Sequence, residues 1–227
     1  MFEQQNNLSG LLLINKPSGI TSFKVVSIIR KKLNVKKVGH CGTLDPLACG
    51  LMLVLVGNAT KQQDKFMKQD KVYYAKIKLG IKTDTGDLEG KVISQTDFSK
   101  ITVEQIKTVC DSFIGEIEQE PPMYSALKIN GKKLYELARK GITVERKKRK
   151  IKIYNIDFLS FNDNEIELRV KCSSGTYIRV LAQEIGSKLK TDATLSYLKR
   201  EQIGNYTLNN AVLLENITSE NLINIVF

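Results

Sequence analysis

Stretches of apolar residues alternate with polar turns along the chain, and their spacing predicts a series of strands. Residues 51–56 are continuously apolar, which predicts a strand buried on both faces. Residues 11–14 predict a second short strand, and residues 72–79 alternate between apolar and polar positions. Residues 150–161 and 165–172 alternate with a period of two around an Asn-Asp-Asn turn, so we expect a β-hairpin there.

Helices are predicted between these strands from their capping residues. Either Thr21 or Ser22 can cap the N-terminus of the first helix. Its expected apolar face consists of four residues: Phe23, Val26, Ile29 and Leu33. Thr102 and Gln105 form the pattern of a capping box, which predicts a second helix that ends near Gly115.

Two more helices are expected at residues 134–140 and 177–189. Hairpins mixed with helices indicate an α+β fold built on a mixed, largely antiparallel central sheet with flanking helices. A chain of 227 residues can form one large domain or two small ones, and it is long enough to bury a real core. No linker or repeat divides the sequence, so we expect a single domain over residues 1–227.

The charge of the chain points to an anionic partner. Lys and Arg exceed Asp and Glu by 35 to 24, a formal net charge of +11. Residues 128–152 contain eleven basic and two acidic residues, and residues 16–37 contain seven basic residues and no acid. Clusters of this kind attract the phosphates of nucleic acids by counterion release, although a merely solvated face remains the alternative reading.

Other classes are disfavoured by composition. No apolar run approaches the roughly 18 residues of a transmembrane helix, and the N-terminus lacks the basic region of a secretory signal, so we expect a cytoplasmic protein. The four cysteines form no C-x-x-C pair, and His40 is the single histidine of the chain. We therefore expect no metal site, no cofactor and reduced, structural thiols.

The segment at residues 38–57 is the densest in potential chemistry. Asp45 lies between Leu44 and Pro46, in a loop bracketed by Gly42 and Gly50, directly before the buried strand. A loop mounted on a buried strand can hold a reactive carboxylate rigidly. From this window alone, the alternative is an aspartate that only helps form a turn beside proline.

A family resemblance favours the reactive reading. The segment resembles the motif G-H-x-G-T-L-D-P-x-A-x-G of TruB-type pseudouridine synthases at every fixed position. Thr43 distinguishes it from the related rRNA-modifying synthases, which usually have Arg before Leu-Asp. The resemblance implies the pseudouridine synthase fold and an isomerase, and it makes Asp45 the catalytic aspartate.

Further motifs follow in family order over nearly the whole chain. Residues 10–22 are similar to the opening motif, in which Lys16 and Pro17 buttress the catalytic loop. By resemblance, residues 71–90 supply an active-site tyrosine, Tyr73, with neighbouring Tyr74 as the alternative. The motif of residues 172–186 supplies a catalytic arginine and an RNA-binding tyrosine: Arg179 and Tyr177. An insertion that grips tRNA is expected around residues 121–150.

The residue types suit the implied reaction. An aspartate can act as nucleophile or base in glycosyl chemistry without a metal. A bidentate arginine such as Arg179 would keep the carboxylate ionised and oriented, although it could instead be a surface arginine of a helix. Tyr73 could stack on the uracil and relay a proton, or be a half-buried strand tyrosine.

RNA contacts are expected from a second group of residues. The target base lies inside a folded loop and must be flipped out, and His40 could stack in its place, or be merely structural. The resemblance adds Lys16 to the RNA-binding residues. The basic stretch would grip phosphates through Arg146, Lys147, Lys148, Arg149 and Lys150.

The resemblance therefore implies an enzyme that converts uridine-55 in the T loop of tRNA to pseudouridine. The expected partner is the T stem-loop, with no membrane and no obligate protein partner. Many relatives have an additional C-terminal PUA domain, which we do not expect here because the chain ends at Phe227. Two alternatives stay open: an RNA chaperone that folds tRNA, and the catalytic subunit of a guide-RNA-dependent pseudouridylase.

Overall fold

The computed structural model describes residues 8–129 and 131–225. Two compact units emerge from the contacts within the chain. Unit 1 holds the residues up to Tyr73 and those from Lys199 onward, and unit 2 holds Tyr74–Leu198. Two strands, β4 (Lys71–Leu79) and β12 (Ala193–Ile203), contribute residues to both units. That the chain functions as one catalytic domain stays a prediction.

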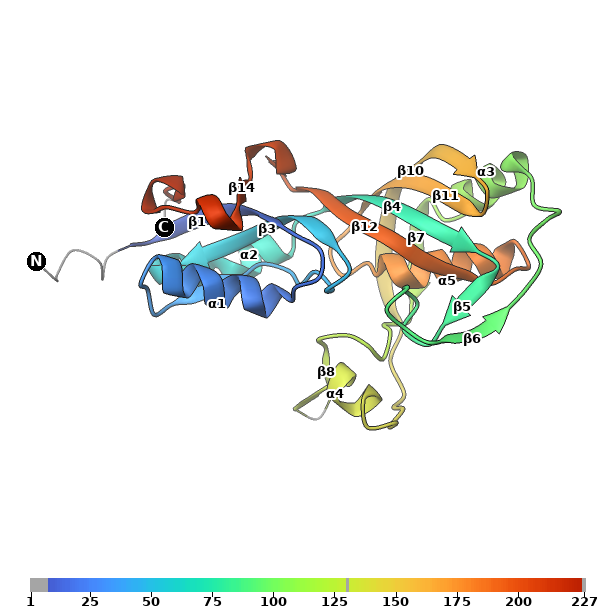
Figure 1. The fold of residues 1–227 in the computed structure, drawn as a ribbon, viewed down its shortest axis with the longest axis horizontal. Coiled ribbons are helices and arrows are strands. Elements are labelled where there is room, and N and C mark those ends of the chain that lie inside the picture. Colours follow the sequence, from blue (N-terminus) through green and yellow to red (C-terminus); the bar gives the residue numbers. More distant parts are fainter. Residues whose placement is uncertain (1–7, 130, 226–227) are drawn as a thin grey trace, which may run out of the picture. The chain divides into compact units, whose positions relative to one another are not determined.

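Unit 1 is built around a central strand, β3 (Cys49–Val56). β1 (Gly10–Lys16) and β2 (Val38–His40) pair with it in antiparallel fashion, and the end of β12 pairs with it in parallel. The short β14 (Val212–Leu213) adds to the far side of β1, which gives the order β14-β1-β3-β12. A further short strand, β13 (Tyr206–Thr207), pairs with β12. Figure 1 shows β14, β1 and β3 of this unit side by side.

The strand at the centre of unit 1 is buried on both faces, as its continuous apolar sequence predicts. Met52, Val54 and Val56 face one core with helix α1 (Ser22–Lys32). The alternate residues of β3 face a second core, in which Phe66 of α2 (Gln63–Met67) takes part. The 3-10 helix η2 (Gly57–Gln62) connects β3 to α2.

The prediction for the first helix is confirmed in its N-terminal cap and wrong in one residue of its buried face. Thr21 caps α1 by accepting a hydrogen bond from the Lys24 amide at 3.1 Å. Phe23, however, is 70% exposed, whereas Val25 is buried with Val26, Ile29 and Leu33. At 100° per residue, Phe23 lies roughly 100° from the middle of the buried stripe, so its ring points to solvent.

The strands of unit 2 follow the order β12-β4-β11-β10-β7. β10 (Arg149–Asn162) pairs in antiparallel fashion with both β11 (Glu165–Cys172) and β7 (Gly115–Gln119). The predicted hairpin is therefore confirmed, and Asp163 makes its turn with a positive φ of 54°. A second, two-stranded sheet consists of β5 (Ile81–Thr83) and β6 (Val92–Gln95).

The helices of unit 2 confirm the predicted positions, with one corrected end. α3 (Val103–Asp111) begins with the predicted capping box, but it ends four residues before Gly115. Gly115 instead begins β7, with a φ of 119° that continues neither a helix nor an ordinary strand. α5 (Ile178–Lys188) matches the predicted helix to one residue at each end, and α4 (Leu134–Ala138) is two residues shorter than expected.

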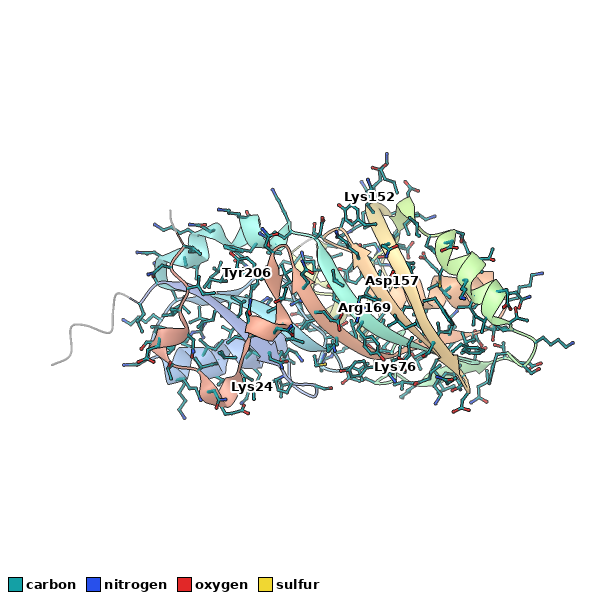
Figure 2. All side chains as sticks on the ribbon, turned by 90° about the horizontal axis from the view of Figure 1, so that it is seen from above. Lys24, Lys76, Lys152, Asp157, Arg169 and Tyr206 are labelled. Carbon is teal, nitrogen blue, oxygen red and sulfur yellow. The ribbon has the colours of Figure 1, made fainter. Side chains whose placement is uncertain are left out.

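The sheet of unit 2 presents a polar face to solvent. β4 alternates between buried and part-exposed residues along its length. Figure 2 shows Lys76 of β4, Arg169 of β11 and Lys152 of β10 on this side. Lys76 forms an ion pair of 2.8 Å with Glu167, so part of the positive charge of this face is neutralised within the unit.

The predicted insertion lies between β7 and β10. It contains a two-stranded ribbon, β8 (Lys128–Ile129) with β9 (Lys132–Lys133), followed by α4. This segment stands off the sheet of unit 2 (Figure 1). Helices and a mixed sheet confirm the expected α+β class. No helix in the described part of the chain is long and apolar enough to cross a membrane.

Candidate active site

The Asp45 loop joins β2 to β3 and is tied to the segment between β1 and α1. The buried hydroxyl of Ser22 accepts a hydrogen bond from the Leu44 amide and also donates to the Leu44 carbonyl, both at 2.9 Å. The Gly19 amide donates to the Pro46 carbonyl at 2.8 Å. These bonds fix the backbone on both sides of Asp45, while the residue itself stays partly exposed.

Lys16 supports this loop from below. Its ammonium group is fully buried and donates hydrogen bonds to the carbonyls of Ala48 at 2.7 Å, Pro17 at 2.9 Å and Pro46 at 3.4 Å. The prediction that Lys16 contacts RNA is therefore corrected, because a side chain with no exposed surface cannot reach a phosphate. Its place agrees with the buttressing role that the resemblance implies.

A second buried cation, Arg200, also supports the loop, and the sequence did not single it out. Its Nε donates to the Leu51 carbonyl at 2.7 Å. Its two terminal nitrogens donate to the carbonyls of Gly42 at 3.1 Å and Thr43 at 3.4 Å. The carbonyls that Arg200 contacts lie 149 to 158 residues away in sequence, so no local sequence pattern indicates this role.

His40 ends β2, close to this cation. Burial is the main cause that lowers the pKa of its imidazole, and the positive charge of Arg200 lowers it further. The backbone of His40 is held by Gln63, whose side-chain amide donates to the His40 carbonyl at 3.0 Å. Nδ1 is buried and has no hydrogen-bond partner among the described residues. At neutral pH the side chain is thus a neutral ring, which suits stacking better than ion pairing.

The two adjacent tyrosines of β4 lie in different surroundings. Tyr73 is buried and belongs to unit 1, the unit of Asp45. Tyr74 belongs to unit 2, where its hydroxyl donates to Glu167 at 2.6 Å and its ring contacts Tyr197 edge-on. Desolvation and the Glu167 hydrogen bond raise the pKa of Tyr74. The hydroxyl of Tyr74 is thus engaged within unit 2, and the catalytic role of Tyr73 stays a prediction.

Arg179 occupies the first turn of α5 in unit 2, and it is buried, so the alternative of a surface arginine is wrong. Its terminal nitrogens donate to the carbonyls of Thr85 at 2.8 Å and Tyr124 at 2.7 Å. Its Nε lies 3.6 Å from a carboxylate oxygen of Asp87. Asp87 was not predicted as a site residue. It lies in the polar turn after β5, where a buried acid is not expected.

Tyr177 is the N-cap residue of the same helix. The side-chain oxygen of Gln119 accepts a hydrogen bond from the Tyr177 amide at 2.8 Å, and its nitrogen donates to the Tyr177 carbonyl at 3.2 Å. Gln119 is itself buried at the end of β7. The backbone at Tyr177 is thereby fixed, which also fixes the start of the helix that holds Arg179.

The predicted basic stretch divides into two parts. Lys147, Lys148 and Lys150 are exposed, and Arg149 is half-buried. Arg146 instead forms an ion pair of 2.5 Å with Glu120 and donates to the Pro121 carbonyl at 3.2 Å. These contacts close the base of the insertion, because they join Glu120 and Pro121 at its start to Arg146 near its end. Arg146 is thus held within the protein, and the three exposed lysines are the better candidates for phosphate contacts.

The predicted site residues therefore fall into two groups. Unit 1 brings together Asp45, Lys16 and His40 around one loop, together with Tyr73 in the same unit. Unit 2 brings together Arg179, Tyr177 and the base of the insertion. Chemically, the first group offers a carboxylate on a rigid loop, and the second offers a buried, fully oriented guanidinium. No cluster of three potential metal ligands occurs among the residues that the structure describes.

The fold belongs to a known class of RNA-modifying enzymes. A Cbf5–Nop10–Gar1 complex is similar with a TM-score of 0.72 and 30% identity, over 91% of this chain and 53% of that chain. An H/ACA RNP bound to a substrate RNA containing 2′-deoxyuridine is similar with a TM-score of 0.69 and 26% identity, over 95% of this chain and 54% of that chain. The chain thus spans about half the length of these solved proteins. The class that fold and loop define is that of the pseudouridine synthases.

Sequence relatives identify the family. Residues 30–178 match the N-terminal domain of TruB family pseudouridylate synthases. A tRNA pseudouridine synthase B from Endomicrobium trichonymphae is 54% identical, with 96% of this chain and 95% of that protein covered. A protein of the same name from Clostridium tetani is 51% identical, with 95% of this chain and 74% of that protein covered. The chain belongs to the TruB family of pseudouridylate synthases.

Proposed function

We propose that this protein is a tRNA pseudouridine synthase that converts uridine-55 of the T loop to pseudouridine. The observation that supports this most is the Asp45 loop, with its G-T-L-D-P sequence and its two buried supporting cations. Relatives about half identical over most of the chain have the name tRNA pseudouridine synthase B. The reaction is an isomerisation, so the enzyme needs no co-reactant.

The bond changes define what the side chains must do. The N1–C1′ glycosidic bond of uridine breaks, the uracil turns, and a C5–C1′ bond forms. C5 then loses its proton and N1 gains one, so atoms and charges balance. We assign the carboxylate step to Asp45, as nucleophile or as base. The rigid backbone around Asp45 supports this assignment, because small displacements of a reacting group cost a large part of the rate.

The remaining catalytic roles are proposed for two buried groups. Arg179 is the catalytic cation, and its fixed orientation by Thr85, Tyr124 and Asp87 supports this role. A guanidinium that is already oriented loses little entropy when it binds a carboxylate or another oxyanion. Tyr73 is proposed to stack on the uracil, a role that its aromatic ring suits and that its place in the unit of Asp45 supports.

Recognition is proposed to rest on the T stem-loop. His40, a neutral and half-buried ring, would stack in the loop in place of the flipped nucleotide. Tyr177 would contact the same RNA from the start of α5. Lys147, Lys148, Arg149 and Lys150 would bind phosphates of the stem, with Arg146 holding the insertion closed at its base.

The deciding experiment uses the purified chain and an unmodified tRNA transcript, with no other protein or RNA. Pseudouridine is mapped by mass spectrometry after nuclease digestion, with Asp45→Asn as the control. We expect one pseudouridine, at position 55, from the wild-type protein and none from the variant. Modification only after a guide RNA is added would indicate the guide-dependent class instead, and accelerated tRNA folding without modification would indicate a chaperone.

A further inference from the structure

Arg200 has an unusual environment for a charged side chain. It is 1% exposed, and within the described residues its guanidinium donates hydrogen bonds to the carbonyl groups of Gly42, Thr43 and Leu51. Burying a cation among neutral groups costs free energy unless dipoles are oriented towards it. Two of these carbonyls, those of Gly42 and Thr43, lie in the loop before Asp45, and the third, that of Leu51, lies in β3 after it.

The register of the sheet shows why the two buried cations reach the same loop. Gly50 of β3 is the pairing partner of Lys16 in β1 and of Arg200 in β12. Side chains at paired positions point to the same face of a sheet. Lys16 and Arg200 therefore flank Gly50 on the face where the loop lies, each about one strand spacing, roughly 5 Å, from it.

The glycines that bracket the loop are adapted to Arg200. At Gly50, which has a φ of 98°, an added Cβ would lie 2.4 Å from the Arg200 carbonyl oxygen. At Gly42, which has a φ of 107°, an added Cβ would lie 3.6 Å from a terminal nitrogen of Arg200. The strained backbone and the close approach at Gly50 both require glycine. The close approach at Gly50 is to the backbone of β12, so β3 lies directly against the strand that holds Arg200.

We propose that Arg200 is a positioning residue of the active site, which sets the place of Asp45 by fixing the backbone on both sides of it. The inference rests on the proposed function, since it assumes that Asp45 reacts. Arg200 touches no substrate atom in this role. Its fork of N–H donors joins three carbonyls at once, a geometry that a lysine ammonium cannot reproduce.

The chain contains its own reporter for this proposal. His40 is the single histidine, so its ring C–H resonances in an NMR spectrum are unambiguous. His40 is the last residue of β2 and lies five residues before Asp45. Arg200 is one of the two causes that lower the pKa of its ring. The titration of His40 therefore reports whether Arg200 still occupies its place beneath the loop, independently of any activity.

Three variants separate charge, geometry and stability. Arg200→Gln removes the charge and part of the donor fork, Arg200→Lys keeps the charge and loses the fork, and Ile29→Val removes one methyl group from the α1 core as a stability control. All three are compared below their melting temperatures, by kcat and KM on a tRNA transcript and by NMR titration of His40.

We expect Arg200→Gln to lower kcat by about a hundredfold, the effect of a displacement near 1 Å, with KM within about threefold of wild type. The His40 pKa should rise in Arg200→Gln, because the neighbouring charge is gone, and stay lowered in Arg200→Lys. The lysine variant should still lose about tenfold or more in kcat, since the fork is lost. Ile29→Val should keep the wild-type kcat.

The proposal is overturned if both Arg200 variants keep the wild-type kcat, or lose no more than Ile29→Val. If the wild-type protein forms no pseudouridine, the proposed function is wrong, and the titration still decides the structural part. An unchanged His40 titration and unchanged loop resonances in Arg200→Gln would then show that Arg200 does not fix the loop.

An independent observation concerns the other end of α1. Its last turn contains Arg30, Lys31 and Lys32, and the chain then reverses at Asn34 with a φ of 50°. A hollow of about 460 Å³ lies here. Six residues line it: Ser27, Arg30, Lys31, Asn34, Val35 and Lys36. No acid lines it, and none of its three cations has an ion pair within the described residues.

This hollow is separate from the Asp45 loop. The loop contacts the first residue of α1 through the Ser22 hydroxyl, whereas the hollow is lined by the second half of α1 and by residues that follow it. Along the helix axis the first lining residue, Ser27, lies about 7.5 Å from Ser22, and the other lining residues lie further along the chain. We infer that the hollow binds phosphates of the substrate RNA outside the target loop, which again rests on the proposed function. Three cations with hydroxyl and amide donors fit a phosphate backbone and carry no base specificity.

The test compares two triple variants of unit 1. Arg30, Lys31 and Lys36 are replaced by Gln in one, and the exposed Lys61, Lys65 and Lys68 near α2 in the other. The slope of log affinity for a tRNA transcript against log salt is measured for both. We expect the first variant alone to reduce the slope, by roughly 2 if each cation neutralises about one phosphate. Equal slopes in the two variants would overturn the inference, and no tRNA binding by the wild type would contradict the proposed function instead.

Discussion

The Nε of Arg179 lies 3.6 Å from the Oδ2 of Asp87, and each of the two side chains is only 5% exposed. Asp87 is in turn held by the Thr85 hydroxyl at 2.6 Å and the Glu89 amide at 3.1 Å. A buried guanidinium that pairs with a buried carboxylate keeps its orientation, and the loss of either partner leaves an uncompensated charge. Asp87 therefore helps to fix the orientation of Arg179, the residue proposed as the catalytic cation.

The first prediction concerns this pair. Asp87→Asn keeps the shape of the side chain but removes its charge, so Arg179 remains buried with its two carbonyl partners alone. We expect the free energy of unfolding to fall by about 3 kcal/mol and kcat to fall by about tenfold or more. Thermal melting and single-turnover kinetics measure the two effects. A double-mutant cycle with Arg179→Met should show strong coupling; additive effects would mean that the pair is not a functional unit.

The second prediction concerns Asp45. Asp45→Asn is nearly isosteric and leaves the bonds from Ser22, Gly19 and Ala48 to the loop backbone in place. We expect no detectable turnover, with the affinity for tRNA within about tenfold of wild type, or roughly 1.4 kcal/mol. Gel-shift titration and pseudouridine mapping on the same samples separate binding from chemistry. Pseudouridine formation near the wild-type rate would remove Asp45 from the mechanism.

The third prediction concerns the exposed part of the basic stretch. Replacing Lys147, Lys148 and Lys150 by Gln should flatten the salt dependence of tRNA binding by roughly 2 in slope, because fewer counterions are released. The matched control replaces three exposed lysines elsewhere in unit 2: Lys91, Lys100 and Lys190. If both triple variants change the slope equally, residues 147–150 are a solvated face.

Arg146 should behave differently from these lysines. Since its guanidinium joins the two ends of the insertion, Arg146→Gln should loosen the insertion rather than remove one phosphate contact. We expect faster hydrogen exchange within residues 121–145 and weaker tRNA binding with little change in salt slope. A lowered slope with unchanged exchange would return Arg146 to the group of phosphate contacts.

The fifth prediction concerns pH. Because the pKa of His40 is lowered in the folded protein, the unfolded chain binds more protons in the window below its ordinary value of 6.5. The stability that neutral His40 contributes is complete above pH 6.5 and falls as the pH drops towards the folded pKa. Urea unfolding at a series of pH values should show this loss in the wild type, and His40→Gln should lack it. Parallel pH curves for the two proteins would contradict the shift.

The sequence by itself determined the elements that depend on local interactions. The continuous apolar run of β3, the period of two in the β10–β11 hairpin and the caps Thr21 and Thr102 were predicted within a few residues. Each of these signals lies within a window of a few residues, where hydrogen bonds and burial follow directly from neighbouring side chains. The motif around Asp45 is local in the same sense, and so its loop could be found.

Only the tertiary structure decided which charged residues are buried and what they hold. Arg200 reaches carbonyls 149 to 158 residues away, Lys16 reaches carbonyls 30 and 32 residues away, and Arg179 reaches Thr85 across 94 residues. A lysine or arginine in a sequence looks the same whether solvent or a loop surrounds it. Its burial depends on strands that pair across the whole chain, and that pairing put Lys16 and Arg200 on either side of Gly50.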